Sequence, residues 1–395
     1  MGLNEDALEL HRSHRGKIAT ALKIKLENKR DLSLAYTPGV AEVCRAIARS
    51  KESVYDYTIK GNTVAVVSDG TAVLGLGDIG PEAAMPVMEG KALLLKAFAN
   101  VDAFPICLGT KDVEEIVNIV TNIAPAFGGV NLEDISAPRC FEIEERLQNL
   151  GIPVMHDDQH GTAIVILAAL INTSKITGKK LEDMRIVISG AGAAGTAVAN
   201  LLLCVGVDKK ICTSVREIIV CDRKGIINRD RTDLTGPKKK LAEHTNPNNT
   251  TGSLSDAMKG ADVFIGLSTA NLVSSDMVKS MAAKSVVFAM ANPVPEIMPE
   301  EAKAAGAFIV GSGRSDYPNQ INNVLAFPGV FRGALDVRAS RIDNRMKISA
   351  AHALANCISS PTVEKILPDA LDKTVAPAVA EAVRKAARES GLARV

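Results

Sequence analysis

The sequence of 395 residues lacks tryptophan and holds few other aromatic residues, nine Phe and four Tyr. Aromatic side chains build the stacking surfaces that bind single-stranded nucleic acid, so we expect no nucleic acid partner. An excess of one charge is also absent, because 46 Lys and Arg stand against 45 Asp and Glu. The net charge of +1 creates no long-range field for polyanions or acidic membranes. Any charged ligand must therefore be bound by local groups.

Long apolar runs are missing as well. The longest, residues 163–171, is far shorter than the roughly 20 residues of a membrane-spanning helix, and acidic residues stand where a signal peptide would have its apolar core. The seven cysteines are scattered and form no CxxC pattern. We expect reduced, mostly buried thiols rather than a disulfide framework or a zinc knuckle. These absences predict a cytoplasmic protein without membrane contact.

From residue 63 onward, short β-branched runs alternate with longer helical patterns, which is typical of parallel sheets with crossover helices. Two sets of strands are expected, at residues 63–67, 102–108, 128–135 and 152–158, and at residues 185–189, 217–222, 262–267, 285–290 and 307–312. The predicted fold class is α/β with two domains. We expect an N-terminal α/β domain over residues 1–160, a second over 161–330, and a helical segment over 331–395 that packs on the domains or on a partner subunit.

A glycine-rich turn, GAGAAG, directly follows an expected strand and opens an apolar helix. Gly190 permits a tight turn, Gly192 lets the backbone approach a pyrophosphate, and Gly195 permits close helix packing. Ala193 and Ala194 stand at the helix N-terminus, whose free N–H groups attract phosphate. The pattern predicts a Rossmann-type dinucleotide-binding domain.

The next expected strand ends at Asp222, where a carboxylate could accept hydrogen bonds from the adenosine ribose. Such a carboxylate would repel a 2′-phosphate and favours NAD over NADP. Arg223 and Lys224 follow, and either cation could pair with that phosphate or remain in solvent. We therefore expect NAD, with NADP as the alternative.

Two acidic pairs, Glu133 with Asp134 and Asp157 with Asp158, end two expected strands. The carboxyl ends of strands form the ligand crevice of an open α/β sheet. The four carboxylates could therefore build an oxygen-only site for Mg²⁺ or Mn²⁺. Helix N-capping by Asp134 and Asp158 is the alternative interpretation.

His156 and His160 flank the second pair with the spacing of a zinc protease helix. The context disfavours that class, because the segment directly follows a strand pattern and Gly161 is expected to interrupt a helix. We expect both histidines to be hydrogen-bonded loop residues.

Four further residues stand in unusual settings. Tyr36 lies in a Pro/Gly turn, Lys91 on an apolar helix, and Asn292 and Asn323 at strand or loop ends. Tyr36 could donate a proton and Lys91 could act as a base. Each also has an ordinary structural interpretation, as a packed tyrosine, a lysine reaching solvent or an Asx turn.

Taken together and in order, SLAYTPGVAEVC, SDGTAVLGLGDIGPEAAMPVMEGKA, NLEDI, HDDQHGTA, GAGAAG, AMANPVPE and NNVLAFPGV resemble the malic enzyme family in its shorter, prokaryote-like form. The resemblance covers about residues 10–385. It implies oxidation and decarboxylation of L-malate to pyruvate with NAD(P)⁺ and a divalent metal, a first domain that binds substrate and metal, and a homodimer.

The resemblance also implies roles for individual residues. Metal ligands are Glu133, Asp134 and Asp158, and Asp157 supports the catalytic base. Lys91 removes the C2 hydroxyl proton, Tyr36 protonates C3 of the enol, and Asn292 and Asn323 lie near substrate and nicotinamide. Lys91 must be neutral to act, so we expect burial near the metal to lower its pKa.

One position departs from the family pattern. Residues 69–74 lack the arginine that contacts substrate carboxylate in the larger members. The Gly70–Thr71 segment or Arg314 could replace it. Two alternatives to the main activity stay open, a malolactic reaction that yields lactate with retained NAD and a non-catalytic dinucleotide sensor.

Overall fold

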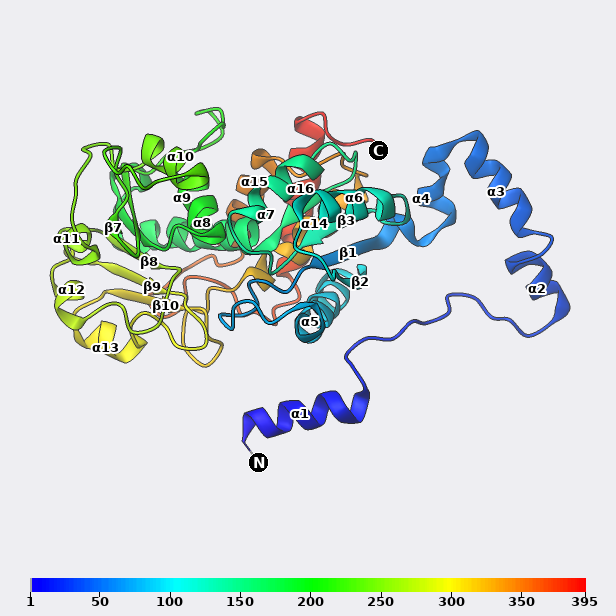
Figure 1. Ribbon diagram of the computed structural model, residues 1–395, viewed down its shortest axis with the longest axis horizontal. Coiled ribbons are helices and arrows are strands. Elements are labelled where there is room, and N and C mark those ends of the chain that lie inside the picture. Colours follow the sequence, from blue (N-terminus) through cyan, green and yellow to red (C-terminus); the bar gives the residue numbers. More distant parts are fainter. Residues whose placement is uncertain (1) are drawn as a thin grey trace.

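The computed structural model describes residues 2–395 and contains two sheets, parallel apart from one short edge strand, joined by a long helix (Figure 1). The first sheet has the order β2-β1-β3-β4, with β1 (Thr63–Ser68), β2 (Asp102–Cys107), β3 (Gly129–Leu132) and β4 (Val154–His156). Crossover helices α5 (Pro81–Ala99), α6 (Val113–Ile123) and α7 (Arg139–Leu147) connect these strands. The four strands expected in this half are confirmed; β1 extends one residue further than expected, and the other three are shorter.

The second sheet has the order β10-β9-β8-β5-β6-β7. Its parallel strands are β5 (Arg185–Ser189), β6 (Glu217–Asp222), β8 (Val263–Gly266), β9 (Val286–Ala289) and β10 (Ile309–Ser312), and β7 (Gly225–Ile226) pairs antiparallel with β6. The helices between them are α9 (Ala193–Leu202), α10 (Gly236–His244), α11 (Leu254–Met258), α12 (Ser275–Lys279) and α13 (Pro299–Ala304). The chain order reverses at β5, which lies between β6 and β8, and ligands bind at such a switch point.

Helix α8 (Asp157–Thr177) joins the two sheets and is almost entirely buried. It continues through Gly161, so the expected interruption there is wrong. Three C-terminal helices, α14 (Phe327–Asp336), α15 (Asn344–Asn356) and α16 (Val375–Glu389), return to the body, where α15 packs on α8 and α14 packs on α5. The C-terminal segment therefore packs on its own chain.

An N-terminal arm, residues 2–50, projects from this body (Figure 1). It carries α1 (Leu3–His14), α2 (Lys29–Ala35) and α3 (Val40–Arg49), and in the described chain none of these helices buries a side chain. A short helix, α4 (Val54–Tyr57), leads into β1. The arm touches the body near Lys17, whose backbone N–H and Nζ donate to Glu89 and to the carbonyl of Pro86. Many of its apolar side chains lie exposed.

One expectation about the cysteines is wrong. Cys204 and Cys212 form a disulfide across the loop that follows α9, with Cα atoms 5.8 Å apart. An eight-residue separation is not a recognised pairing motif, and only the turn of the chain brings the two together. Cys44, Cys107, Cys140, Cys221 and Cys357 are thiols as expected, although Cys44 is exposed.

Within residues 2–395, no helix has both the length and the apolar character that crossing a bilayer requires.

Candidate active site

The two acidic pairs meet at one edge of the first sheet. Glu133 and Asp134 follow β3, Asp157 and Asp158 open α8 directly after β4, and β3 pairs with β4. One oxygen from each of Glu133, Asp134 and Asp158 lies within 4.8 Å of the others. Helix α7 begins after Pro138 and α8 after His156, so neither Asp134 nor Asp158 is an N-cap residue.

Lys91 of α5 closes this cluster from the opposite side. Its Nζ lies 2.5 Å from Asp157 Oδ2 and 3.0 Å from Glu133 Oε1, and 4.6 Å from the ring centre of Phe327. All of these side chains are buried, so the lysine does not reach solvent. The structure therefore brings the predicted base and the predicted metal ligands into contact.

Burial and mutual repulsion shift the pKa values of these groups. Burial, reinforced by Asp158, raises the pKa of Asp134 to about 8, and burial raises the pKa of Asp157 to about 6. Burial alone would lower the pKa of Lys91, but Asp157, Glu133 and Asp158 outweigh it and raise that pKa above its ordinary value. Attraction by the three carboxylates thus exceeds the cost of desolvation within the chain itself, and the lowering expected beside a bound metal stays a prediction.

The acids fit a divalent cation by their donor chemistry. All three offer carboxylate oxygens, the ligands that Mg²⁺ and Mn²⁺ prefer. Asp134 Oδ2 is buried and, within residues 2–395, has no hydrogen-bond partner. The backbone N–H of Asp134 donates to Asp158 Oδ2 at 2.8 Å, which holds the two acids side by side.

The two histidines differ from expectation, because neither is a loop residue. His156 ends β4, and within the described residues its ring nitrogens have no hydrogen-bond partner. His160 lies on α8, with Nε2 3.0 Å from Glu144 Oε2 and Nδ1 3.1 Å from Lys347 Nζ. This buried Glu144–His160–Lys347 network, behind the acids, has no local sequence signal, since its members come from α7, α8 and α15.

The two asparagines lie at different places. A Cβ placed on Gly161 would lie 3.1 Å from Cβ of Asn323, which puts Asn323 beside the first turns of α8. Asn292 follows β9, and its Nδ2 would lie 2.9 Å from a Cβ on Gly313. Tyr36 is 67% exposed at the end of α2. Figure 1 shows α2 apart from α5, which carries Lys91.

The candidate replacements for the missing arginine are already engaged. Thr71 Oγ1 donates to Asp69 and accepts from Arg139 at 2.9 Å. The N–H groups of Gly70 and Thr71 donate to Ser68 and Asp69. Arg314 pairs with Asp316 at 2.6 Å. Arg139, which sequence reasoning missed, organises this segment by also pairing with Asp69 at 2.7 Å.

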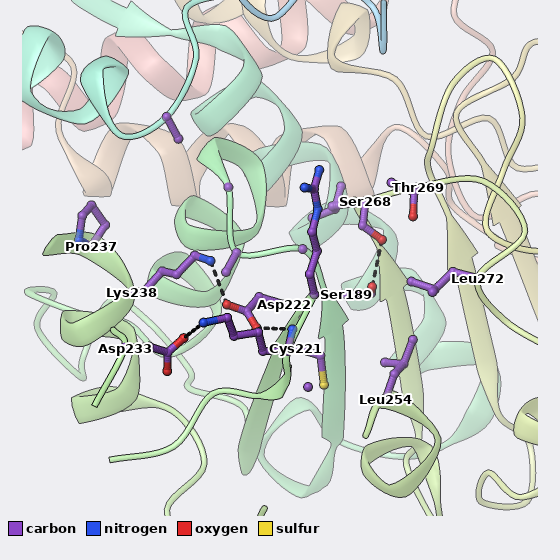
Figure 2. A pocket seen from close by; sticks show the side chains of 18 of the residues that line it. Ser189, Cys221, Asp222, Asp233, Pro237, Lys238, Leu254, Ser268, Thr269 and Leu272 are labelled. Carbon is purple, nitrogen blue, oxygen red and sulfur yellow. Dashed lines mark hydrogen bonds and ion pairs between the residues drawn. The ribbon is translucent and has the colours of Figure 1, made fainter. Parts of the chain in front are cut away.

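A cavity of about 1160 Å³ lies at the carboxyl ends of β5 and β6 (Figure 2). Gly190, Gly192, Asp222 and Arg223 line it, together with Pro138 and Phe141 of the first half. Gly190 has a φ of +115°, which glycine adopts readily. A Cβ on Gly192 would meet no atom within 4 Å, so the backbone there is open to a ligand. Ala193, Ala194 and Gly195 form the first turn of α9.

Contrary to expectation, the Asp222 carboxylate is not free to accept hydrogen bonds from the adenosine ribose. Its carboxylate accepts from Arg231 Nη1 at 2.8 Å and from Lys238 Nζ at 2.7 Å, and Figure 2 shows Lys238 beside it. Partial burial opposes ionisation, yet the hydrogen bonds from Arg231 and Lys238 lower the pKa of Asp222 to about 2. Neither Arg231 nor Lys238 belongs to a recognised motif. Arg231 comes from the loop that follows β7, and Lys238 comes from α10.

Comparison with known proteins agrees with this architecture. The model of the malic enzyme N-terminal domain matches residues 15–148, and that of the malic enzyme NAD binding domain matches residues 159–388. A bifunctional malic/malolactic enzyme of Bacillus subtilis is 56% identical, over 100% of this chain and 95% of its own length. An NAD-dependent malic enzyme of Geobacillus stearothermophilus is 57% identical over 96% of this chain and 78% of its own.

Solved structures of malic enzymes are also similar to this chain. The crystal structure of an NAD-dependent malic enzyme from Thermotoga maritima aligns with a TM-score of 0.91 at 51% identity, over 96% of this chain and 99% of that one. A malic enzyme from Pyrococcus horikoshii aligns with a TM-score of 0.94 at 47% identity, over 100% of this chain and 92% of that one. With both domain models matched and these identities, the chain belongs to the malic enzyme family.

Proposed function

We propose that the protein oxidises and decarboxylates L-malate to pyruvate and CO₂, with NAD(P)⁺ as oxidant and Mg²⁺ or Mn²⁺ as cofactor. The observation that carries the proposal is the contact of Lys91 with Asp157 beside three clustered carboxylates. A base, a carboxylate partner and oxygen ligands for a cation are the groups that this reaction needs. The Rossmann-type domain supplies the coenzyme site.

Glu133, Asp134 and Asp158 would hold the cation. When bound, the cation would supply Lewis-acid polarisation of the C2 oxygen of malate, and the coenzyme would supply the hydride acceptor. Neutralising these carboxylates would also remove part of the attraction that raises the pKa of Lys91. Asn292 and Asn323 offer amide groups that could orient the substrate and the nicotinamide.

Lys91 would take the C2 hydroxyl proton at its Nζ, and for that step it must be neutral. Asp157 Oδ2, 2.5 Å away, is the acceptor for the proton that Lys91 releases. Burial raises the pKa of Asp157 to about 6, which suits a group that receives a proton near neutral pH.

Tyr36 would donate a proton to C3 after CO₂ departs, and it would do so in the site of a second copy of this chain. The arm that carries it exposes leucine and isoleucine side chains to solvent, at Leu3, Leu8, Leu22, Ile24 and Leu34. An apolar arm of this kind fits a homodimer in which each chain extends across its partner.

The test measures initial rates with L-malate and Mn²⁺, offering NAD⁺ and NADP⁺ separately, with a chelator control and a pyruvate assay. We expect chelator-sensitive reduction of coenzyme matched by an equal amount of pyruvate. Lys91→Ala should lower kcat by orders of magnitude with unchanged coenzyme affinity, whereas Lys96→Ala, an exposed lysine on the same helix, should not. Unaltered turnover of Lys91→Ala would remove Lys91 from the mechanism.

A malolactic reaction is the second candidate, because a relative at 56% identity is named a bifunctional malic/malolactic enzyme. In that reaction the coenzyme stays bound and returns its hydride to give lactate. Lactate formed without net reduction of coenzyme would identify it, and the same assay detects it.

A further inference from the structure

Glu296 is a buried acid that the reaction described above does not use. Its side chain is fully buried, and within residues 2–395 it forms no ion pair. Burial raises its pKa, and hydrogen bonds from backbone N–H groups oppose that rise. A carboxyl group buried without a cation is costly, so packing alone does not explain an acid at this position.

The two oxygens of this carboxylate bridge two loops at the carboxyl ends of strands. Oε1 accepts from the backbone N–H of Ser268, after β8, at 2.9 Å, and Oε2 accepts from that of Ala291, after β9, at 3.1 Å. The carboxyl group lies directly over Gly266, because a Cβ there would lie 2.6 Å from Glu296 Oε1. The bridge therefore requires a glycine at the end of β8.

The loop after β8 belongs to the wall of the dinucleotide cavity. Ser268 lines that cavity together with Gly190, and Figure 2 shows its side chain pointing toward Ser189. The two hydroxyl oxygens of these serines lie 2.8 Å apart. A Cβ on Gly190 would collide with the carbonyl oxygen of Leu267, so the loop and the glycine-rich turn are in close contact. Glu296 thus fixes a loop on which that turn packs.

The loop after β9 carries Asn292 directly after Ala291. A Cβ on Gly75 would collide with the carbonyl oxygen of Asn292, so this loop also touches the first half of the chain. A dinucleotide lies across the point where the strand order reverses, with one nucleotide on each side. Asp222 at the end of β6 marks the adenosine side, and the nicotinamide half would lie over β8 and β9, where Glu296 joins the two loops.

We propose that Glu296 is a positioning residue, which fixes the loops after β8 and β9 so that the nicotinamide ring is held in the geometry that hydride transfer needs. Both oxygens accept from N–H groups, so a glutamine would present its own NH₂ to one donor and lose that bond. A small displacement of reacting groups can cost about 100-fold in rate. The proposal rests on the proposed function, because it assumes hydride transfer to a dinucleotide in this cavity.

The test compares Glu296→Gln with Glu300→Gln, at an exposed glutamate on α13. Fluorescence titration with NADH and NADPH measures binding of the whole coenzyme, and calorimetry with 5′-AMP measures binding of the adenosine half alone. In Glu296→Gln we expect affinity for the reduced coenzyme to fall about tenfold and affinity for 5′-AMP to stay unchanged. Glu300→Gln should match the wild type with every probe.

The same variant should lower kcat for malate about 100-fold. The deuterium isotope effect on kcat, measured with malate labelled at C2, should increase, because hydride transfer then limits the rate more strongly. Ser268→Ala is a second variant, which loses the contact with Ser189 and keeps the N–H that Glu296 binds. It should weaken binding of the reduced coenzyme several-fold, again without a change for 5′-AMP.

Unchanged coenzyme affinity and kcat in Glu296→Gln, or an equal loss of 5′-AMP and coenzyme binding, would overturn the positioning role. If Glu296→Gln does not fold, wild-type behaviour of Ser268→Ala would overturn it. Malate oxidation by the wild type is measured separately. If the wild type oxidises malate and Glu296→Gln equals it, this inference alone fails. If the selective loss of coenzyme binding occurs in a protein that does not oxidise malate, the proposed function fails and the role of Glu296 toward the coenzyme stands.

Discussion

At the scale of single residues, the chemistry depends on a few buried charges that compensate one another. Lys91 contacts both Asp157 and Glu133, and Asp134 and Asp158 lie beside them. Within residues 2–395, no lysine or arginine forms an ion pair with either of these last two acids. Burying acids in excess of bases is costly unless a positive ion joins them. This excess of buried acids supports the proposed cation site.

Asp158→Asn is expected to weaken binding of Mn²⁺, because an amide replaces one of three anionic ligands. Removal of a group that only supports a metal ligand lowers metal affinity roughly 10–100-fold. Replacement of a ligand itself should lower the affinity for Mn²⁺ at least as much. Titration calorimetry measures it, with Asp183→Asn, an exposed aspartate, as control. A normal affinity in Asp158→Asn would mean that the acids do not hold the metal.

Glu144 provides a test of the buried network behind the acids. Burial would raise its pKa, but His160, Lys347 and His156 outweigh burial and hold the pKa of Glu144 at about 2, against an ordinary 4.5. A carboxyl group with a lowered pKa in the folded state stabilises the fold above pH 4.5, and this contribution disappears as the pH falls toward 2.

We therefore expect Glu144→Gln to lose about 2 kcal/mol of unfolding free energy at pH 7, through the hydrogen bonds that the carboxylate accepts, and less as the pH approaches 3. Urea denaturation at several pH values measures both quantities. Glu142→Gln, at an exposed glutamate on the same helix, should change little at any pH. A deficit in Glu144→Gln that does not vary with pH would argue for lost packing instead of lost charge.

At the scale of elements, helix packing holds the first sheet to the C-terminal segment. Helix α14 packs on α5, which carries Lys91, and α16 covers α14. Gly329 and Gly333 of α14 face Val379 and Val383 of α16, and a Cβ on Gly333 would lie 2.8 Å from Cβ of Val383. The close approach of these two helices requires residues without a side chain.

Gly333→Ala should consequently destabilise the protein by about 1–3 kcal/mol, although alanine is the better helix former. Thermal unfolding gives the sign. Gly90→Ala, on α5 where an added Cβ meets no atom within 4 Å, should instead raise stability by about 1 kcal/mol. Stabilisation by both substitutions would show that α14 and α16 can separate without cost.

At the scale of the whole molecule, the N-terminal arm lacks a core of its own. Its helices bury no side chain within the described residues, and Figure 1 shows α2, which Tyr36 follows in the chain, apart from α5, which carries Lys91. A segment of this length remains ordered only if apolar surface is buried elsewhere. We infer that the partner chain in a homodimer supplies that surface.

Mixing two inactive variants tests this arrangement. If Tyr36 serves the partner's site, a mixed dimer of Tyr36→Phe and Lys91→Ala contains one intact site. Random mixing after refolding or co-expression should then restore about a quarter of the wild-type rate. Sedimentation should report a dimer in each preparation. Dimers without any recovered activity would place Tyr36 and Lys91 of one chain in the same site.

The sequence by itself determined the strands, their parallel class, the dinucleotide turn and the chemistry at each strand end, because these depend on local periodicity and on residues adjacent in the chain. The meeting of Lys91 with the acids, the saturation of Asp222 by Arg231 and Lys238, the Glu144 network and the Cys204–Cys212 disulfide were decided only by tertiary structure. Each of these four contacts joins residues that are distant in the chain or lie across a turn, and no local sequence pattern encodes such a contact. The pKa values depend on the same contacts, because charge interactions depend on distance and burial.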